Sequence, residues 1–324
     1  MCTAVTYRTR DHYFGRNLDL EYSYREAITI TPRHFPLSFR YVKPQTQHYA
    51  MIGMATVMDG YPLYYEATNE KGLSMAGLNF PGNASYLTED AKKENVAPFE
   101  FIPYLLGQCA NLEQAKNLLQ RVNLVNTPFS PSLPLSPLHW IVADRDASIT
   151  VEPMADGLRI HHNPIGVLTN NPPFDFHLYN LQNYLNISVD PAVNRFSRHI
   201  DMEPYSNGMG GIGLPGDFSS ASRFVKAAFV KLNSRSGDSE EESVHQFFHI
   251  LSSVAMPRGS VQIHPDEYEI TLYSCCCNTD RGIYYYTTYE KSQITGIDMH
   301  REDLNSSVLI SYPLARQASI EIQN

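Results

Sequence analysis

The chain has 324 residues, of which 43% are hydrophobic and 18% charged, as is typical of a globular protein. The net charge of -9 is spread along the chain without a block of lysine or arginine, so a nucleic-acid partner is not expected. No apolar stretch approaches the roughly 18 residues that a membrane span requires, and the polar N-terminus lacks the apolar core of a secretory signal. We therefore expect a cytoplasmic protein with no membrane partner.

The five cysteines occupy positions 2, 109 and 275–277. Their number is odd and their spacing is neither the C-x-x-C of a zinc site nor a disulfide framework, which favours a reducing compartment. Because successive side chains of a strand point to opposite faces, the C-C-C run cannot converge on one metal ion. We expect it to be buried, and we expect neither a metal nor another cofactor.

The order of the periodic segments predicts an α+β protein of one domain, residues 1–324, with antiparallel sheet packed between helices. No repeat and no linker divides the chain. Strand patterns are found at residues 2–8, 13–18, 27–32, 49–58, 62–68, 73–79, 138–143, 148–152, 157–161, 166–169, 268–276, 282–288 and 307–311. Helical patterns are found at about 98–109, from 111 to about 122, at 175–185, around 225–232 and around 244–251; Asn111/Gln114 and Ser239/Glu242 resemble capping boxes.

A proline-rich segment, TPFSPSLPLSPLHW, begins at Thr127 and has prolines at every third position. This spacing favours an extended, polyproline-like path. The segment is interpreted first as a rigid loop, second as an apolar wall of a ligand pocket, and third as a partner-binding motif.

Cys2 becomes the first residue if Met1 is removed, and its thiol then shares a residue with a free α-amine. An α-amine titrates near 7.7 to 8.0, so it can activate a thiol whose ordinary pKa is about 8.5. Such a residue is sufficient for acyl transfer if other groups converge on it. If residues 13–18 pair with the first strand, Arg16 and Asp19 lie beside Cys2, Arg16 favouring the thiolate and Asp19 holding the amine. The alternatives are an inert cysteine and a surface ion pair.

Five separated motifs occur in order: MCTAV with YFGRNLDLEYSY, GLNFPGNASY, VLTNNPPFDFHLYNLQNY, LPGDFSSASRF and YSCCCNTDRGIYYYTTYEKSQI. Together they resemble the choloylglycine hydrolase family, the bile salt hydrolases and penicillin V acylases of the N-terminal nucleophile superfamily. The resemblance runs nearly end to end. It implies a four-layer αββα fold, in which two stacked, mainly antiparallel sheets are flanked by helices, and hydrolysis of a linear amide after removal of Met1.

The resemblance also implies the catalytic residues. Cys2 matches the nucleophile, and the matching charged and amide groups around it are Arg16, Asp19, Asn79, Asn170 and Arg223. Asn79 and Asn170 are expected to donate hydrogen bonds to the oxyanion, with Asn171 as an alternative to Asn170. Arg223 lies in the first turn of a predicted helix, where the helix dipole disfavours a cation, so a reason other than local stability is expected for it; the alternative is a solvated arginine.

The implied substrate is a glycine- or taurine-conjugated bile salt, whose rigid sterol requires a broad apolar cleft with a polar end. Asn79 favours bile salts over penicillin V, since the acylases often have tyrosine at this position. Candidate cleft residues near the catalytic motifs are Leu20, Tyr22, Tyr24, Met58, Tyr61, Tyr65, Phe129, Leu133 and Leu135. The alternatives are penicillin V or another N-acyl substrate, and a non-catalytic carrier of amphipathic ligands. The resemblance further implies a bacterial homotetramer.

Overall fold

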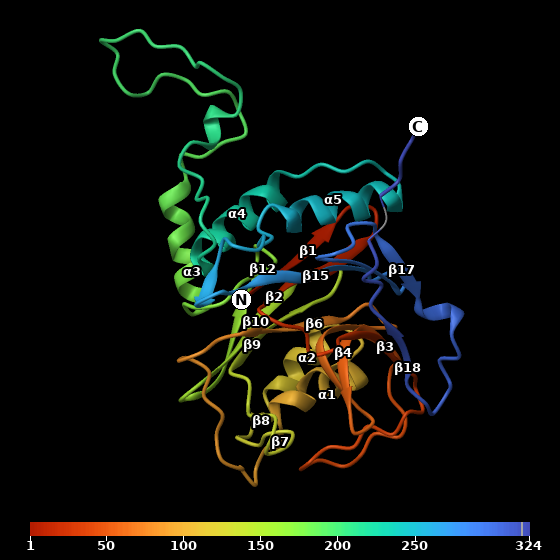
Figure 1. Ribbon diagram of the computed structural model, residues 1–324. Coiled ribbons are helices and arrows are strands. Elements are labelled where there is room, and N and C mark those ends of the chain that lie inside the picture. The colour runs from red at the N-terminus through yellow and green to blue at the C-terminus, as the bar shows by residue number, and fades with distance from the viewer. Residues whose placement is uncertain (319) are drawn as a thin grey trace.

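Two antiparallel sheets lie face to face and carry helices on both outer faces in the computed structural model, which describes residues 1–318 and 320–324 (Figure 1). The predicted α+β class and the four αββα layers are confirmed. Within the described residues, no helix is long and apolar enough to cross a membrane.

The first sheet has the strand order β12-β1-β2-β15-β16-β17, and all its neighbouring strands are antiparallel. Its centre is the hairpin that begins the chain, with β15 beside it. The strands are β1 (Cys2–Arg8), β2 (His12–Leu20), β12 (Val167–Leu168), β15 (Ile270–Asn278), β16 (Ile283–Thr288) and β17 (Thr295–Asp298).

The second sheet has the order β11-β10-β9-β6-β5-β4-β3-β18 and is also antiparallel throughout. Short turns join most of its strands. The strands are β3 (Ala27–Thr31), β4 (Met51–Met58), β5 (Tyr61–Asn69), β6 (Ser74–Asn79), β9 (Leu138–Ala143), β10 (Ser148–Met154), β11 (Gly157–His162) and β18 (Ile310–Pro313).

Helices α4 (Ser220–Asn233) and α5 (Glu240–Ser252) cover the first sheet, while α1 (Phe101–Gln108) and α2 (Leu112–Leu119) cover the second (Figure 1). On α2, α4 and α5, apolar side chains recur on one face and are buried against the sheet, as the helical period requires, whereas α1 is buried along nearly its whole length. The capping box of Ser239 and Glu242 is present at α5. At α2 the Asn111 side chain accepts from Gln114 N, but the Gln114 side chain accepts from Ala110 N, so the predicted box is only half formed.

The remaining elements are short. They are β7 (Glu94–Val96), β8 (Val122–Leu124), β13 (Gln262–His264), β14 (Glu267–Tyr268), α3 (Phe174–Asn180) and the 3₁₀ turns η1 (Pro98–Glu100), η2 (Leu181–Tyr184), η3 (Met209–Gly211) and η4 (Met299–Arg301). The helical pattern predicted at 175–185 corresponds to α3 and η2 together. The sequence analysis missed β7, β8, β13 and β17, because three or four residues contain too little of the strand period to be recognised.

The core between the two sheets is built from the alternating inward side chains of both. Cys275, Cys276 and Cys277 lie on β15 and are buried as free thiols, as predicted for this run. Cys276 lies on the opposite face of the strand from its two neighbours, because side chains alternate along a strand.

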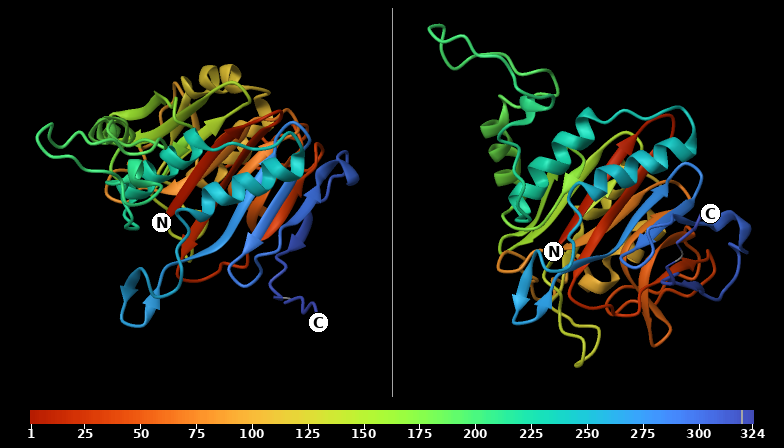
Figure 2. Two further views of the ribbon diagram at one scale, coloured as in Figure 1. Left: turned by 90° about the horizontal axis from the view of Figure 1, so that it is seen from above. Right: turned by 45° about the horizontal axis from the view of Figure 1, so that its top comes forward.

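The chain between η2 and η3 leaves the sandwich as a long arm, seen in green and teal (Figures 1 and 2). Its base is closed where Ser188 N donates to Gly210 O at 2.9 Å. Large apolar side chains on the arm are exposed, among them Leu185, Val189, Val193, Phe196, Ile200 and Tyr205. Most of the arm therefore contributes nothing to the core of its own subunit.

Candidate active site

The β1–β2 hairpin places Cys2 at the end of the first sheet. Cys2 pairs with Leu18, and Ala4 pairs with Arg16, in the antiparallel register. Residues directly opposite each other share a face, and so do residues two apart along a strand. Cys2 and Arg16 therefore lie on the same face, as predicted, and that face is turned toward the second sheet.

Arg16 is fully buried between the two sheets. Its Nη1 atom donates to Gly77 O at 2.6 Å and to Tyr65 O at 3.1 Å, and lies 3.8 Å from the Glu66 carboxylate. Burial opposes the charge, but the attraction of neighbouring acidic groups, among them Glu66, outweighs burial and raises the pKa of Arg16. A permanent cation thus faces the same side of the sheet as the thiol and favours its ionised form.

Asp19 and Arg223 lie on the opposite face of the same strands. Arg223 extends from α4 and donates through Nη1 to Cys2 O at 2.5 Å and to Thr3 Oγ1 at 2.6 Å. Its Nη1 also lies 3.9 Å from the Asp19 carboxylate, which accepts from Thr271 Oγ1 at 2.6 Å. Burial raises the pKa of Asp19, while Arg223 opposes that shift. Asp19 and Arg223 are therefore a buried pair behind the Cys2 backbone, rather than a solvated surface pair.

Asn170 follows β12 and reaches the backbone nitrogen of Cys2. Its Oδ1 atom accepts from Cys2 N at 2.9 Å and from Arg223 Nη2 at 2.7 Å, and its Nδ2 atom donates to Asn79 O at 2.7 Å. The neighbouring Asn171 instead donates from Nδ2 to Pro81 O at 2.5 Å. Of the two alternatives, Asn170 is the one that contacts Cys2, and it does so through its oxygen, with its NH₂ group already engaged by main chain.

Met1 is held beside this cluster. Its ammonium donates to Asp19 O at 2.7 Å and forms an ion pair with Glu269, and Asp19 N donates to Met1 O at 3.0 Å. Burial lowers the pKa of this amine. In this form the nitrogen of Cys2 belongs to a peptide bond, so it cannot accept a proton.

Two polar atoms next to Cys2 have no hydrogen-bond partner among the described residues. They are Nη2 of Arg16 and Oδ2 of Asp19, and both are buried. Arg16 lines the cleft described below, whereas Asp19 does not, and its Oδ2 atom lies 3.9 Å from Arg223 Nη1.

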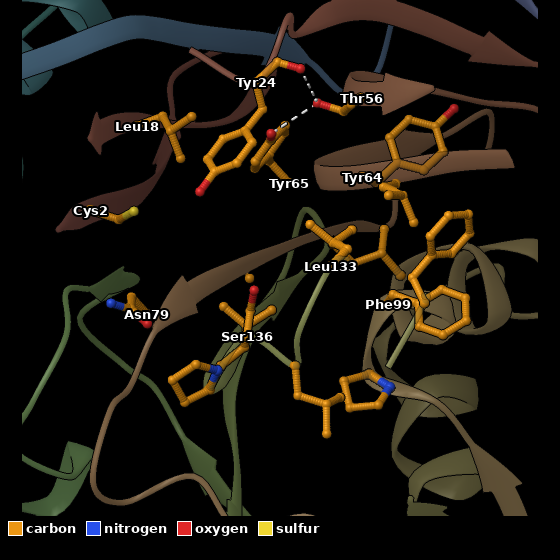
Figure 3. Close-up of a pocket in the computed structure, with 18 of the residues that line it drawn as sticks. Cys2, Leu18, Tyr24, Thr56, Tyr64, Tyr65, Asn79, Phe99, Leu133 and Ser136 are labelled. Carbon is orange, nitrogen blue, oxygen red and sulfur yellow. Dashed lines mark hydrogen bonds between the residues drawn. The ribbon is translucent and has the colours of Figure 1, made fainter. Parts of the chain in front are cut away.

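Cys2 opens onto a cleft of about 330 Å³ between the edges of the two sheets, within the usual range for small-molecule sites (Figure 3). Seven of the nine predicted cleft residues line it: Leu20, Tyr24, Met58, Tyr65, Phe129, Leu133 and Leu135. The proline-rich segment forms one wall, in keeping with its second interpretation. On the opposite wall, Thr56 Oγ1 forms hydrogen bonds with Tyr24 O and with the Tyr65 hydroxyl, which connects these lining residues (Figure 3).

Tyr22 and Tyr61 are not among the lining residues. Tyr22 is half exposed and its hydroxyl contacts that of Tyr24 at 2.9 Å. Tyr61 packs behind the cleft against the rings of Phe99 and Phe129. Both therefore support residues that line the cleft.

The sequence analysis missed several lining residues, chiefly on β5 and β9 and around η1. They include Leu18, Thr56, Leu63, Tyr64, Gly77, Phe99, Ile102, Ser136 and Trp140. Distance from the catalytic motifs in the sequence concealed Phe99 and Ile102, which only packing of α1 on the second sheet brings near. Asn79 is at the last position of β6 and lines the cleft, where it faces Cys2 across the same end (Figure 3).

The arrangement is that of an N-terminal nucleophile hydrolase: a cysteine at the end of a central strand, charged groups on both sides of it, and a four-layer sandwich around it. Comparison with known families agrees. Residues 2–312 match the model of linear amide C–N hydrolases of the choloylglycine hydrolase family. The chain belongs to this family and is therefore an amidohydrolase of linear amides.

Its curated relatives include bile salt hydrolases. The chain is 54% identical over 318 residues to a bile salt hydrolase/transferase of Lactiplantibacillus plantarum, covering 98% of each chain. It is 38% identical over 329 residues to a bile salt hydrolase/transferase of Clostridium perfringens, covering all of both chains.

Solved structures have the same fold. A variant of conjugated bile acid hydrolase from Clostridium perfringens matches with a TM-score of 0.92 at 38% identity, covering 100% of both chains. Penicillin V acylase from Agrobacterium tumefaciens matches with a TM-score of 0.76 at 21% identity, covering 97% of this chain and 92% of the other. At this lower identity, the match to the acylase shows a shared fold and does not indicate a shared substrate.

Proposed function

We propose that this chain hydrolyses the amide bond of glycine- or taurine-conjugated bile salts, with Cys2 as nucleophile after removal of Met1. The observation that carries the proposal is the position of Cys2, whose backbone is held by Asn170 and Arg223 while its side chain lines an apolar cleft. The relatives named bile salt hydrolases support the substrate class.

Acyl transfer follows from this arrangement. Once Met1 is removed, Cys2 has a free α-amine, and the proton of its thiol passes to that amine. The sulfur attacks the amide carbonyl, and the amine returns the proton to the leaving nitrogen of glycine or taurine. Water then attacks the thioester and its proton passes through the amine to the sulfur, so that the C–S bond breaks, the free bile acid leaves and the thiol is regenerated.

The neighbouring residues serve different steps. Arg16 stabilises the thiolate from the side of the cleft, while Asn79, at the cleft wall, donates to the oxyanion. Asn170 Oδ1 is placed to accept a hydrogen bond from the new amine, with Asp19 and Arg223 fixing its surroundings. We assign amine orientation to Asn170, instead of the oxyanion donation expected at first, because its Nδ2 atom already donates to Asn79 O.

The cleft suits a sterol with a few hydroxyl groups. Aliphatic and aromatic side chains dominate its lining, while Tyr24, Thr56, Tyr65 and Ser136 provide hydroxyl groups along it. A large rigid apolar body gains from such burial at about 25 cal/mol per Å² of apolar surface. The same machinery acting on penicillin V or another N-acyl compound is the second candidate, because the apolar lining of the cleft would also accept another acyl group.

The decisive experiment compares purified wild-type protein with Cys2→Ala. Intact mass reports the loss of Met1, and amino-acid and phenoxyacetate release are measured from glycocholate, taurocholate and penicillin V. We expect processed wild-type protein to release glycine or taurine, and Cys2→Ala to release neither. Cys2-dependent release from penicillin V alone would change the substrate but not the mechanism. Equal binding of bile salts by both proteins, without turnover, would establish a carrier.

We further propose that the chain folds as one domain over residues 1–324, and that four copies assemble in the cytoplasm. The arm between η2 and η3 supports assembly, because it exposes apolar side chains outside the core of its own subunit. Its closed base allows residues 189–209 to be replaced by two glycines. Light scattering is expected to give a tetramer for the wild-type chain and a smaller species for the shortened one; an unchanged mass would exclude the arm from the interface.

A further inference from the structure

Two buried histidines form hydrogen bonds with the main-chain carbonyl groups of Thr169 and Asn170. His139, on β9, lies with Nε2 at 3.0 Å from Thr169 O, and His177, on α3, lies with Nε2 at 3.0 Å from Asn170 O. Both side chains are completely buried. Consecutive carbonyl groups therefore each accept a hydrogen bond from an imidazole that belongs to a different element of the fold.

Each histidine is stacked on a phenylalanine that directly follows a candidate catalytic residue. The ring of His139 lies on Phe80, with centroids 4.2 Å apart and an interplanar angle of 6°, and Phe80 follows Asn79. The ring of His177 lies on Phe224 at 4.7 Å and 22°, and Phe224 follows Arg223. The first stack thus connects the carbonyl before Asn170 with the residue after Asn79. The second connects the carbonyl of Asn170 with the residue after Arg223.

Glu152 supports the first stack from β10. Its carboxylate lies 3.2 Å from His139 Nδ1 and accepts from Phe174 N, at the start of α3, at 2.9 Å. Burial opposes ionisation of Glu152, but the neighbouring imidazoles of His139 and His161 outweigh burial and lower its pKa to about 2. Glu152 thus fixes the plane of the His139 ring through Nδ1, while Nε2 of the same ring lies beside Thr169 O.

Within the described part of the chain, His177 is held through one nitrogen only. Burial lowers its pKa to about 4, so the ring is neutral near pH 7. Because Nε2 donates to a carbonyl, the proton is on Nε2, and Nδ1 has no partner among the described residues. Among the described residues, the imidazole therefore forms a hydrogen bond only with Asn170 O.

We propose that His139 and His177 are positioning residues, which hold the Thr169 and Asn170 carbonyls through paired histidine–phenylalanine stacks and so fix Asn170 Oδ1 against the Cys2 nitrogen. Neither histidine is assigned contact with substrate. The inference rests on the proposed function, because the stacks are proposed to preserve the orientation of the Cys2 amine, which is the base in that mechanism. A misplacement of about 1 Å at such a site can cost on the order of a hundredfold in rate, so a partial loosening is expected to cost about tenfold.

The test compares His177→Gln with His177→Asn. Both introduce an amide, but only glutamine reaches the position of Nε2 and can donate to Asn170 O. We expect kcat for glycocholate to fall about tenfold in His177→Asn, with KM within twofold of wild type, and to recover to within threefold in His177→Gln. His12→Gln is the matched control, because His12 is also buried but bonds through Nδ1 to Thr279 at the far end of the hairpin. It should lower thermal stability and leave kcat unchanged.

A second readout separates this inference from the proposed function. The rate at which iodoacetamide alkylates Cys2 is measured against pH, with peptide mass spectrometry to identify the cysteine. His177→Asn should displace the midpoint of this profile, and His177→Gln and His12→Gln should not, whether or not bile salts are substrates. Equal loss of kcat in all three variants, or an unchanged kcat and profile in His177→Asn, would overturn the inference.

If His177→Asn gives no soluble protein, Phe224→Leu takes its place. This change removes the stacked ring but none of the hydrogen-bonding groups. The same loss of kcat and displaced alkylation profile are expected, and wild-type values for both would refute the role of the stacks.

Discussion

Asn170 and Cys2 lie 168 residues apart in the chain, yet the side-chain oxygen of Asn170 accepts a hydrogen bond from the backbone nitrogen of Cys2 at 2.9 Å. This nitrogen becomes the catalytic amine if Met1 is removed. The contact therefore connects the segment after β12, the edge strand that pairs with β1, with the residue proposed to perform the chemistry.

Replacing Asn170 by alanine tests this contact. The amine would lose its acceptor and Arg223 would lose the partner of Nη2, so kcat is expected to fall about a hundredfold. Asn171→Ala is the control, because Asn171 bonds to Pro81 O and not to Cys2, and it should remain within about threefold of wild type. Initial rates of glycine release decide, and equal losses in both variants would contradict the assignment.

Asn79→Ala tests oxyanion stabilisation. The side chain is at the last position of β6 and at the wall of the cleft, so its loss should remove a donor in the transition state. The expected effect is a fall in kcat on the order of a hundredfold with little change in KM. A raised KM with unchanged kcat would instead show that Asn79 only binds the substrate.

Arg16→Met tests the buried charge pair between the sheets. Glu66 would keep its hydrogen bonds from Tyr273 and Tyr284 but lose the guanidinium 3.8 Å away, at an expected cost of about 3 to 5 kcal/mol in unfolding free energy. Adding Glu66→Gln removes the buried acid, whose pKa is already raised by burial, and should recover about 1 to 3 kcal/mol. Urea unfolding measures both; strictly additive losses would show that the two residues are not coupled.

The pH dependence of stability tests His12. Burial lowers its pKa from 6.5 to about 4, so between these values the unfolded chain binds the proton that the folded chain does not. Stability contributed by the neutral ring is present above pH 6.5 and is lost as the pH falls toward 4. His12→Asn, which can keep the contact with Thr279, should reduce the loss of unfolding free energy across this window by about 3 kcal/mol. Parallel profiles for the two proteins would contradict this expectation.

Much of the fold was predictable from the sequence, because long amphipathic segments determine their own secondary structure. Strand β1 and strand β9 begin and end where the side-chain alternation predicts. The failures are the shortest strands and the half-formed box at Asn111, where a single side chain had two nearby donors to choose from. Local competition of this kind is decided by the surrounding backbone, which the sequence pattern does not describe.

The hairpin contacts of the site were predictable for a similar reason. Cys2 and Arg16 lie on adjacent strands of one hairpin, so the pairing of these two strands is enough to place them on the same face. Asn170 and Arg223 were reached only through family resemblance, and the direction of the Asn170 amide was not anticipated. Nothing local to the motif determines which atom of that amide faces Cys2.

The sequence by itself determined the class of the protein, the nucleophile and the strands that support it, since these depend on composition, periodicity and ordered motifs. Only the tertiary structure decided which groups surround Cys2, that Tyr22 and Tyr61 lie outside the cleft, and that His139 and His177 hold the turn bearing Asn170. The physical reason is that most of these contacts join residues far apart in the chain. Their distances are set by how two sheets and their helices pack, and no short segment contains that information.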